Sequence, residues 1–270
     1  MNEEDRFSGV NRLYGSHAMQ TLKQTHVCVI GLGGVGSWAV EALARSGVGK
    51  ITIIDYDEIT EGNINRQMHA MSSTLGKKKY EVLRDRIMDI NPNCLVEAID
   101  DYINENNIWE YLSPERDLDY VIDAIDSIKF KANIIYFCKR NKIPVITTGG
   151  AGGITDPASI STKDLSRTYN DALAARVRSL LRADFGFSKN PKRYFGVECV
   201  FSNQQKVYPG QDGAVSTNKP GIHGVHLDCR YGYGSVSFVT ASFGFIAVSR
   251  VLNRILKNNS RKQQVQTSQQ

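Results

Sequence analysis

The segment VCVIGLGGVGSWAVEALARSGVGKITIIDYD, residues 27–57, constrains the fold more than any other part of this 270-residue chain. An apolar run is followed by a glycine-rich turn, a helix-forming stretch that ends at Gly47, and a second apolar run that ends in an acid. Strands without polar alternation are typical of a parallel sheet covered on both faces. The segment therefore predicts a β-α-β unit of a doubly wound sheet.

The same alternation of strand and helix continues to residue 150. Further strands are expected at 95–100, 119–126 and 143–150, and helices at 75–92, 104–112 and 127–141. Beyond residue 150 the pattern changes to short strands at 158–165, 196–202 and 205–210, a helix at 170–186 and a late apolar helix at 235–252. We therefore predict the α/β class, with a doubly wound, mostly parallel Rossmann-like sheet and an antiparallel C-terminal elaboration on that sheet.

Composition narrows the class of protein. The apolar fraction of 41% and the charged fraction of 23% are ordinary for a globular protein, and the net charge of +5 permits an anionic partner. None of the five cysteines forms a C-x-x-C pair, which argues against a structural zinc site, and the chain opens without a signal peptide. The apolar stretch 235–252 contains serines and a glycine, so we predict a buried helix, no membrane association and a cytoplasmic location.

The glycine-rich turn matches a nucleotide-binding pattern. Gly31, Gly33 and Gly36 satisfy G-x-G-x-x-G, in which glycine allows a tight turn and lets a phosphate approach the N-H groups at a helix N-terminus. Asp55 is expected to end the second strand, where a ribose-binding acid belongs. On these residues alone a nicotinamide dinucleotide remains a good alternative to ATP.

Residues farther along the chain favour ATP with Mg²⁺. Arg66 and Lys79 supply two cations, and Asp126 is expected to end the fourth strand as a metal-binding carboxylate. A dinucleotide brings two phosphates that the backbone largely holds, whereas a triphosphate brings about four negative charges, each worth about 1.5–3 kcal/mol in a charge-assisted contact. Alone, Asp126 would be read as a cap of the following helix.

Together these motifs resemble the ubiquitin-activating-enzyme-like superfamily over residues 8–155. The resemblance rests on GLGGVG, on Asp55 and Asp57, on N-x-x-R-Q from Asn63 to Gln67, on Lys79 and on Asp126. It implies adenylation chemistry in which Asp126 holds Mg²⁺, and Arg66, Lys79 and Asp126 are catalytic. The implied nucleotide-binding set is Gly31, Gly33, Gly34, Gly36, Asp55, Asp57, Asn63, Arg66, Lys79, Asp126 and Ser127.

Two further catalytic candidates come from the same resemblance. Arg12, in NRLYG, is similar to an early arginine that can reach the ATP of a neighbouring subunit, and the superfamily implies a homodimer. Cys229 lies in a glycine-rich context and could carry an acyl group as a thioester. The alternative for Cys229 is a buried structural thiol, because a nucleophile already present in the substrate needs no thioester.

The second half resembles the branch of the superfamily that acts on a modified tRNA. Its motifs are TTGGAGG at 147–153, DALAARVR at 171–178, GVECVFS at 196–202 and LDC followed by GYGS at 227–235. The implied reaction is the ATP-dependent dehydration of threonylcarbamoyladenosine next to the anticodon, by adenylation of the threonyl carboxylate and ring closure with release of AMP. The resemblance also allows a sulfur-transfer protein as a partner. The sequence departs from the family pattern at Gly62, because the residue before Asn63 is usually Ser or Thr.

A basic segment at 163–193 is a candidate tRNA surface. It carries eight cations against three acids, which could follow RNA phosphates, although a solvated helix face would look the same. The tRNA-binding candidates are Arg167, Arg176, Arg178 and Arg182.

We divide the chain into an ATP-binding adenylation core (1–155), an elaboration for the tRNA substrate (156–256) and a disordered tail (257–270). The main alternative function is an adenylyltransferase that activates the C-terminus of a sulfur-carrier protein. A nicotinamide-dependent oxidoreductase and a non-catalytic scaffold are less compatible with Arg66, Lys79 and Asp126.

Overall fold

The computed structural model describes residues 3–210, 213–218 and 233–267. The strands are β1 (His26–Ile30), β2 (Lys50–Ile54), β3 (Leu95–Ile99), β4 (Tyr120–Asp123), β5 (Val145–Thr148), β6 (Ile160–Asp164), β7 (Glu198–Ser202), β8 (Tyr208–Pro209) and β9 (Val215–Ser216). The α-helices are α1 (Glu3–Arg6), α2 (Ser8–Tyr14), α3 (Ser16–Gln24), α4 (Gly36–Arg45), α5 (Lys79–Ile90), α6 (Ile108–Leu112), α7 (Ile128–Arg140), α8 (Ala172–Asp184) and α9 (Ser237–Thr267). Short 3-10 helices lie at Glu61–Asn63, Ser72–Thr74, Pro114–Arg116, Pro157–Ser159 and Leu165–Arg167.

Seven strands form one sheet in the order β3-β2-β1-β4-β5-β7-β6. Neighbouring strands are parallel except β6, which pairs antiparallel with β7. β1 pairs with both β2 and β4, so the chain reverses its direction of winding across the sheet at the carboxyl end of β1. Ligands bind at such a switch point in open α/β sheets. The predicted fold class is confirmed, and the glycine turn lies at this point.

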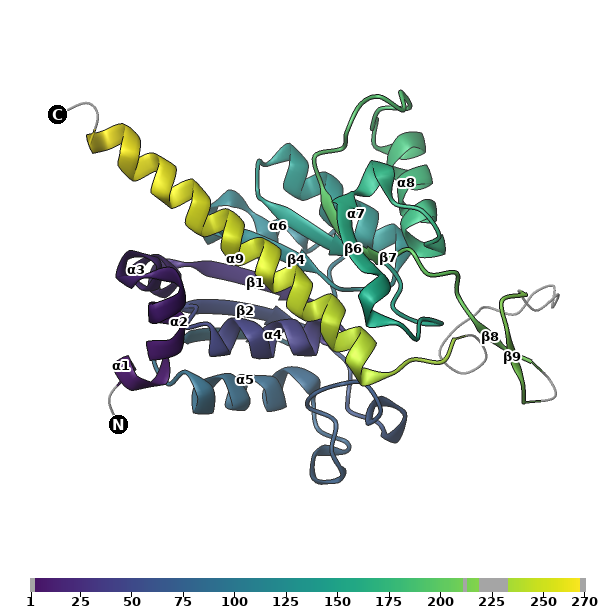
Figure 1. The fold of residues 1–270 in the computed structure, drawn as a ribbon, viewed down its shortest axis with the longest axis horizontal. Coiled ribbons are helices and arrows are strands. Elements are labelled where there is room, and N and C mark those ends of the chain that lie inside the picture. The colour runs from purple at the N-terminus through teal and green to yellow at the C-terminus, as the bar shows by residue number, and fades with distance from the viewer. Residues whose placement is uncertain (1–2, 211–212, 219–232, 268–270) are drawn as a thin grey trace.

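Two helical layers cover the sheet (Figure 1). On one face, α4, α5 and α9 pack against Val27 and Val29 of β1. On the other face, α6, α7 and α8 share one core cluster with Cys28 and Ile30 of the same strand, and α8 packs on α7. All five β1 residues are buried, which explains its continuous apolar sequence.

The late apolar stretch forms the start of α9, which crosses α4 closely. Val239, Phe243 and Val251 are fully buried, and a side chain at Gly244 would collide with the backbone of α4 near Val35. By length and composition, one helix in the described ranges could cross a membrane, over Ser237–Ser260, and 50% of its apolar window is buried inside the protein. The predicted packing of this helix in the core is therefore confirmed.

Helices α5 and α6 each begin four residues after the predicted start, and α9, β4 and β8 also differ from the predicted bounds. α9 continues to Thr267, so residues 257–267 are helical where the sequence predicts a disordered tail. The tail is rich in Lys, Arg and Gln, which favour helix, and it continues a helix already anchored in the core. β4 ends at Asp123, three residues before Asp126, and the expected strand at 205–210 is reduced to β8 in a separate pair with β9.

Candidate active site

The glycine turn joins β1 to α4 and presents the N-terminus of α4. Gly31 has φ +86°, and a Cβ there would come within 2.8 Å of Ile125 in the β4–α7 loop. A Cβ at Gly36 would overlap the Gly31 carbonyl, so both glycines are required by the packing of the chain. At Gly33 the nearest atom to such a Cβ is 3.9 Å away, on Gln67. Gly33 therefore leaves its backbone open to a ligand.

Asp55 fixes the glycine turn from the neighbouring strand. Its carboxylate accepts from the N-H of Leu32 at 2.6 Å and from the N-H of Asp57 at 2.8 Å. Burial raises the pKa of Asp55, and the charge of Lys79 together with these two amides opposes that rise. Asp55 follows directly after β2, close to the predicted strand end, and each of its oxygens keeps a further lone pair for a ribose hydroxyl.

Lys79 brings a buried cation to the same edge of the sheet. It is the first residue of α5, and its Nζ lies 2.6 Å from Asp57 and 4.0 Å from Asp55. The backbone N-H of Lys79 donates to the Asp57 carbonyl, which holds the helix start against the end of β2. The chain therefore keeps this ammonium group between two carboxylates, where phosphate oxygens could replace Asp57 as its partner.

Arg66 lies over the glycine turn. Its Cγ is 3.3 Å from the position that a Cβ of Gly34 would occupy. Its carbonyl accepts from Trp38 Nε1 at 3.0 Å and from Thr240 Oγ1 at 3.2 Å, so α4 and α9 fix the backbone from two sides. Asn63 accepts from the N-H of Thr60 at 3.0 Å, which orders the short helix before Arg66.

Asp126 is an exposed carboxylate in the loop between β4 and α7. Helix α7 begins after Ser127, whose side chain makes no capping bond, and Asp126 is not the N-cap residue. The charges of Asp57, Asp55 and Asp126, together with partial burial, raise the pKa of Tyr56. Within the described ranges no three His, Cys, Asp or Glu side chains form a cluster that could hold a metal ion by themselves.

Sequence reasoning missed the residues that support this edge. Asp123, at the end of β4, is fully buried and pairs with Lys131 at 2.9 Å and with Thr147 at 2.7 Å. A lysine between apolar helix positions and an acid inside an apolar strand are the signals that could have revealed the pair. Tyr56 and Tyr102 also meet at 5.4 Å between ring centroids beside the carboxylates, without a sequence signal.

One catalytic candidate, Arg12, is not brought to this site within one chain. Arg12 is exposed on α2, at the end of the molecule where Phe7 packs against Gly47 after the last turn of α4. The glycine turn lies at the other end of that helix, so Arg12 does not join the site within one chain (Figure 1). Cys229 lies outside the described residues.

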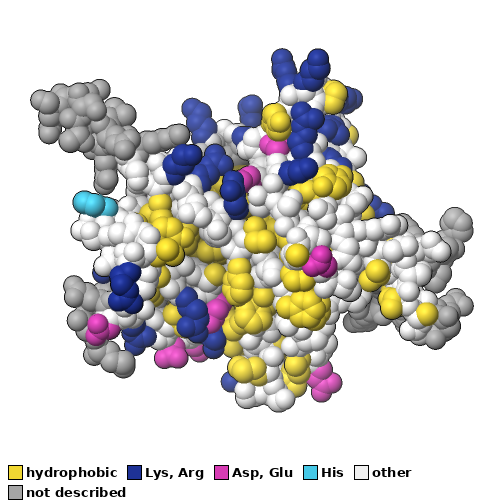
Figure 2. All heavy atoms as spheres, viewed as in Figure 1, with side chains coloured by type: hydrophobic (Ala, Val, Ile, Leu, Met, Phe, Trp, Pro, Cys, Tyr) yellow, Lys and Arg dark blue, Asp and Glu magenta, His cyan; other side chains and the backbone are white. Residues whose placement is uncertain are grey.

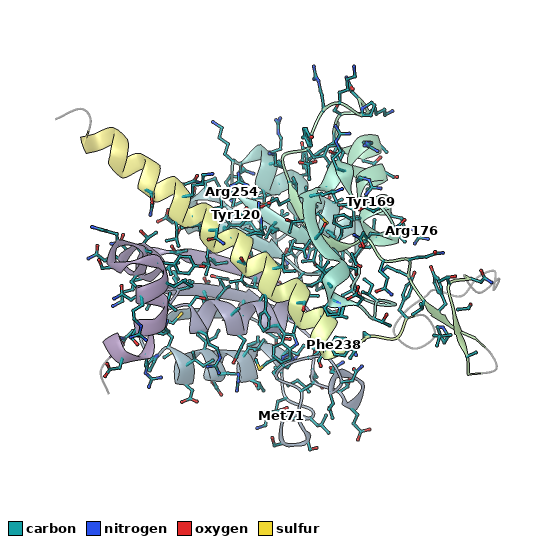
Figure 3. The ribbon with its side chains drawn as sticks, in the orientation of Figure 1. Met71, Tyr120, Tyr169, Arg176, Phe238 and Arg254 are labelled. Atoms are coloured by element: carbon teal, nitrogen blue, oxygen red, sulfur yellow. The ribbon has the colours of Figure 1, made fainter. Side chains whose placement is uncertain are left out.

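The basic segment surrounds α8. Figure 2 shows Lys and Arg side chains concentrated over the upper part of this face, where β6, α7 and α8 lie in Figure 1. Arg176, labelled at the right of Figure 3, is exposed on α8. Arg167 lies over the ring of Tyr194, and Arg182 lies over the ring of Phe195. Arg178 donates a hydrogen bond to Thr168. These three arginines are partly buried.

The glycine turn at a helix N-terminus, a buried acid and two cations above it define a nucleotide-binding α/β protein. The open backbone at Gly33, with Lys79 and Arg66 nearby, fits a polyphosphate better than a group held by backbone alone. The chain belongs to the ThiF family, whose model matches residues 8–269.

A similar protein and two solved structures match this chain across almost their whole length. A tRNA threonylcarbamoyladenosine dehydratase of Haemophilus influenzae is 52% identical over 96% of each chain. Among solved structures, the E. coli tRNA N6-threonylcarbamoyladenosine dehydratase in complex with ATP is 45% identical with a TM-score of 0.85, and its complex with AMP is 46% identical with a TM-score of 0.84. Both structures cover 96% of this chain, and this chain covers 96% of each.

Proposed function

We propose that this chain is an ATP-dependent tRNA threonylcarbamoyladenosine dehydratase. The observation that carries the proposal is the 52% identity to a dehydratase over 96% of both chains, combined with the nucleotide set at the carboxyl end of β1. The reaction is the adenylation of the threonyl carboxylate, followed by closure of a ring inside the modified side chain with release of AMP. The nucleophile for the second step belongs to the substrate.

The chain contributes position and charge to this reaction. The N-H groups of the glycine turn and the α4 N-terminus hold phosphate oxygens, and Asp55 accepts from a ribose hydroxyl while it fixes Leu32. Lys79 and Arg66 stabilise the charge that develops on the phosphates when pyrophosphate leaves. Asn63, Asp57 and Ser127 complete the proposed nucleotide contacts.

Mg²⁺ is part of the proposal, with Asp126 as its protein ligand. Asp126 is exposed at the edge where the phosphates would lie, and a hard carboxylate oxygen is the ligand that Mg²⁺ prefers. A single protein carboxylate fits this ion, because Mg²⁺ usually retains waters and takes its other ligands from substrate phosphates. When bound, the ion would neutralise phosphate charge.

We further propose that residues 156–256 receive the tRNA, with Arg167, Arg176, Arg178 and Arg182 at the surface that contacts it. Arg176 is exposed, and the other three lie on or near α8. A cytoplasmic location is part of the proposal, and it is supported by four free buried cysteines: Cys28, Cys94, Cys138 and Cys199.

A homodimer is also proposed. Apolar side chains gather around the start of α9, where Phe238 is 53% exposed and Phe245 is 46% exposed (Figures 2 and 3). Exposed aromatic clusters of this kind are typical of protein interfaces. In such a dimer Arg12, which is remote from the site of its own chain, would be available to the partner.

The test is mass spectrometry of nucleosides from tRNA that carries threonylcarbamoyladenosine, after incubation with the protein, ATP and Mg²⁺. We expect that nucleoside to lose the mass of one water, only when ATP is present. Asp126→Asn should abolish the conversion, and Asp89→Asn, which changes an exposed carboxylate on α5, should retain it. ATP-dependent activation of a sulfur-carrier protein, with unchanged tRNA, would instead favour the adenylyltransferase alternative.

A further inference from the structure

A pocket of about 340 Å³ lies outside the nucleotide set, between the start of α8 and the segment after β7. Its walls include Asp171, Arg178, Lys206 and Tyr208. Asp171 and Lys206 both bond to Gly150, which lies just beyond the carboxyl end of β5. The pocket therefore opens at the same carboxyl edge of the sheet as the glycine turn.

The pocket is suited to an anion. The two carboxylate oxygens of Asp171 are already engaged, one by the N-H of Ala174 and one by the N-H of Gly150, each at 2.9 Å. Lys206 is 8% exposed and donates to the Gly150 carbonyl at 2.8 Å. Burial lowers the pKa of Lys206, so an anion in the pocket would favour its charged form. Together with Arg178, the wall carries two cations and one satisfied acid.

The glycine run TTGGAGG belongs to this pocket. A side chain at Gly149 would overlap the Asp171 carboxylate, and one at Gly150 would come within 2.8 Å of Lys206 Nζ. At Gly152 and Gly153 a Cβ would come within 2.8 Å of Tyr233. The run lies two strands from the glycine turn. It needs glycine because Asp171, Lys206 and Tyr233 approach its backbone too closely for a side chain.

Aromatic rings add a flat apolar surface. Tyr208, in the wall, packs on Tyr233 with ring centroids 5.2 Å apart, and Lys206 lies over the Tyr233 ring at 4.9 Å. Cations beside an aromatic surface are the features with which proteins bind an unpaired base and its phosphate. A pocket above roughly 300 Å³ is in the range that binds a small organic group.

The pocket also lies within reach of the nucleotide site. Thr148, at the end of β5, donates to the carbonyl of Asp123 at the end of β4, and Asp126 follows three residues later. Neighbouring strands are about 4.8 Å apart, so the two to three strands that separate the pocket from the glycine turn correspond to roughly 10–15 Å. A modified side chain that extends from a base in the pocket would point along this edge.

We propose that this pocket receives the modified adenosine of the tRNA after this nucleotide has flipped out of its stack. Its base would lie against Tyr208, and its anionic groups would lie beside Arg178 and Lys206. The inference rests on the proposed dehydratase function and assigns a place to its second substrate. Base flipping supplies access to the modified group and lets the pocket distinguish modified from unmodified RNA.

The test compares the binding of two anticodon stem-loop RNAs, one with threonylcarbamoyladenosine and one with unmodified adenosine, by fluorescence anisotropy. The key variants are Ala175→Glu and Ala175→Gln, which add side chains of equal size to the pocket wall and differ by one charge. We expect the wild-type protein to prefer the modified RNA, and Ala175→Glu to lose at least tenfold of that preference relative to Ala175→Gln.

Tyr208→Leu provides a second variant, with Tyr14→Leu, an exposed tyrosine at the end of α2, as its control. Tyr208→Leu should also lower the preference by about tenfold. Affinity for ATP should remain at the wild-type value in all four variants, which verifies that each is folded. The inference would be overturned if the Ala175→Glu and Ala175→Gln proteins bound each RNA with the same affinity. It would also be overturned if Ala175→Glu weakened the binding of the modified and the unmodified RNA by the same factor.

The two proposals fail in different ways. If the wild-type protein converts no modified tRNA, the dehydratase function fails. If it converts modified tRNA while Ala175→Glu and Ala175→Gln retain the same preference, only the pocket assignment fails.

Discussion

Gly33 and Gly36 belong to one motif, and the structure gives them different reasons to be glycine. A side chain at Gly36 would collide with the carbonyl of Gly31, which is a demand of the fold itself. A side chain at Gly33 would meet only Gln67, at 3.9 Å, so nothing in the described part of the chain excludes it. The sequence identifies both positions, but only the geometry separates the glycine needed for packing from the glycine that leaves room for a ligand.

The ionisation of His69 affects stability. It is 1% exposed, and neither ring nitrogen has a hydrogen-bond partner among the residues described. Burial, helped by the charge of Lys79, lowers the pKa of His69 from 6.5 to about 4. The unfolded chain therefore binds more protons than the folded one between these two values, so stability is lost as the pH falls through this window.

We expect the wild-type protein to lose about 2 kcal/mol of unfolding free energy through His69 when the pH falls from 7.5 to 5. In His69→Phe, which keeps a ring but removes the titration, this contribution should vanish. Urea unfolding at both pH values measures the difference. Other titrating groups, such as His26, are common to both proteins, so parallel losses in the two would contradict the assignment.

At the scale of elements, helix α9 departs most from the sequence prediction. Its first half is specified by the apolar pattern that covers α4, and the pattern predicts a buried helix there. The second half has no apolar periodicity, so composition alone predicts disorder. The structure continues the helix to Thr267 because propagation from an anchored helix is cheap once nucleation has been achieved.

The exposed side of α9 gives a prediction about assembly. Phe245 is 46% exposed and packs on Trp38 with ring centroids 6.0 Å apart. If this surface is the dimer interface, Phe245→Asp should weaken self-association at least tenfold, because a charge would be buried without a partner. Light scattering during size-exclusion chromatography measures the change.

Met88→Asp on α5 is the matched control, since Met88 is a similarly exposed apolar residue, at 42%. It should leave the oligomeric state unchanged. A Phe245→Asp protein that associates as tightly as the wild type would show that this face does not form the interface.

The end of β4 illustrates why element boundaries resist prediction. The run from Tyr120 through Ile125 is apolar apart from Asp123, and Asp126 is the first acid with a plausible metal role. The strand ends at Asp123 instead, and the carboxylate of Asp123 turns inward to Lys131 and Thr147. Such a buried pair is recognised only after the strand and the helix are placed together.

At the scale of the whole molecule, the described cysteines are divided between the two faces of the sheet. Cys94 lies in the core beneath α4 and α9, and Cys28, Cys138 and Cys199 lie in the core beneath α7 and α8. All four are buried, and burial raises the pKa of each thiol, to about 11 for Cys94. Neutral, inaccessible thiols react slowly.

Thiol titration tests this arrangement. A Cys229→Ser protein contains the four buried cysteines only, so we expect almost no reaction with Ellman's reagent in the native state and four equivalents after denaturation. Rapid reaction of a native thiol would contradict the burial of these side chains. The same variant, assayed for conversion of tRNA, tests the thioester hypothesis: retained conversion would exclude it.

The placement of the proposed nucleotide-binding residues could largely be predicted, because these residues follow successive parallel strands, whose carboxyl ends meet at one edge. Gly33, Asp55 and Lys79 are brought to that edge by the topology, and Lys79 lies at the start of α5. The support of Arg66 was not predictable, since Thr240 follows it by 174 residues and no local pattern links them. The pocket beside α8 is equally non-local, because it joins segments after β5, before α8 and after β7.

The bond from Thr240 to the carbonyl of Arg66 has a consequence for synthesis on the ribosome. At a translation rate of 5–20 residues per second, the 174 residues between them take roughly 9–35 s to produce. During that interval the nascent β1–α4 unit is without α9, and its apolar outer surface is uncovered. A nascent chain therefore exposes this apolar surface to chaperones and proteases until α9 has emerged. A truncation before α9 removes both the helix that covers the surface and the hydrogen bond from Thr240 that holds Arg66.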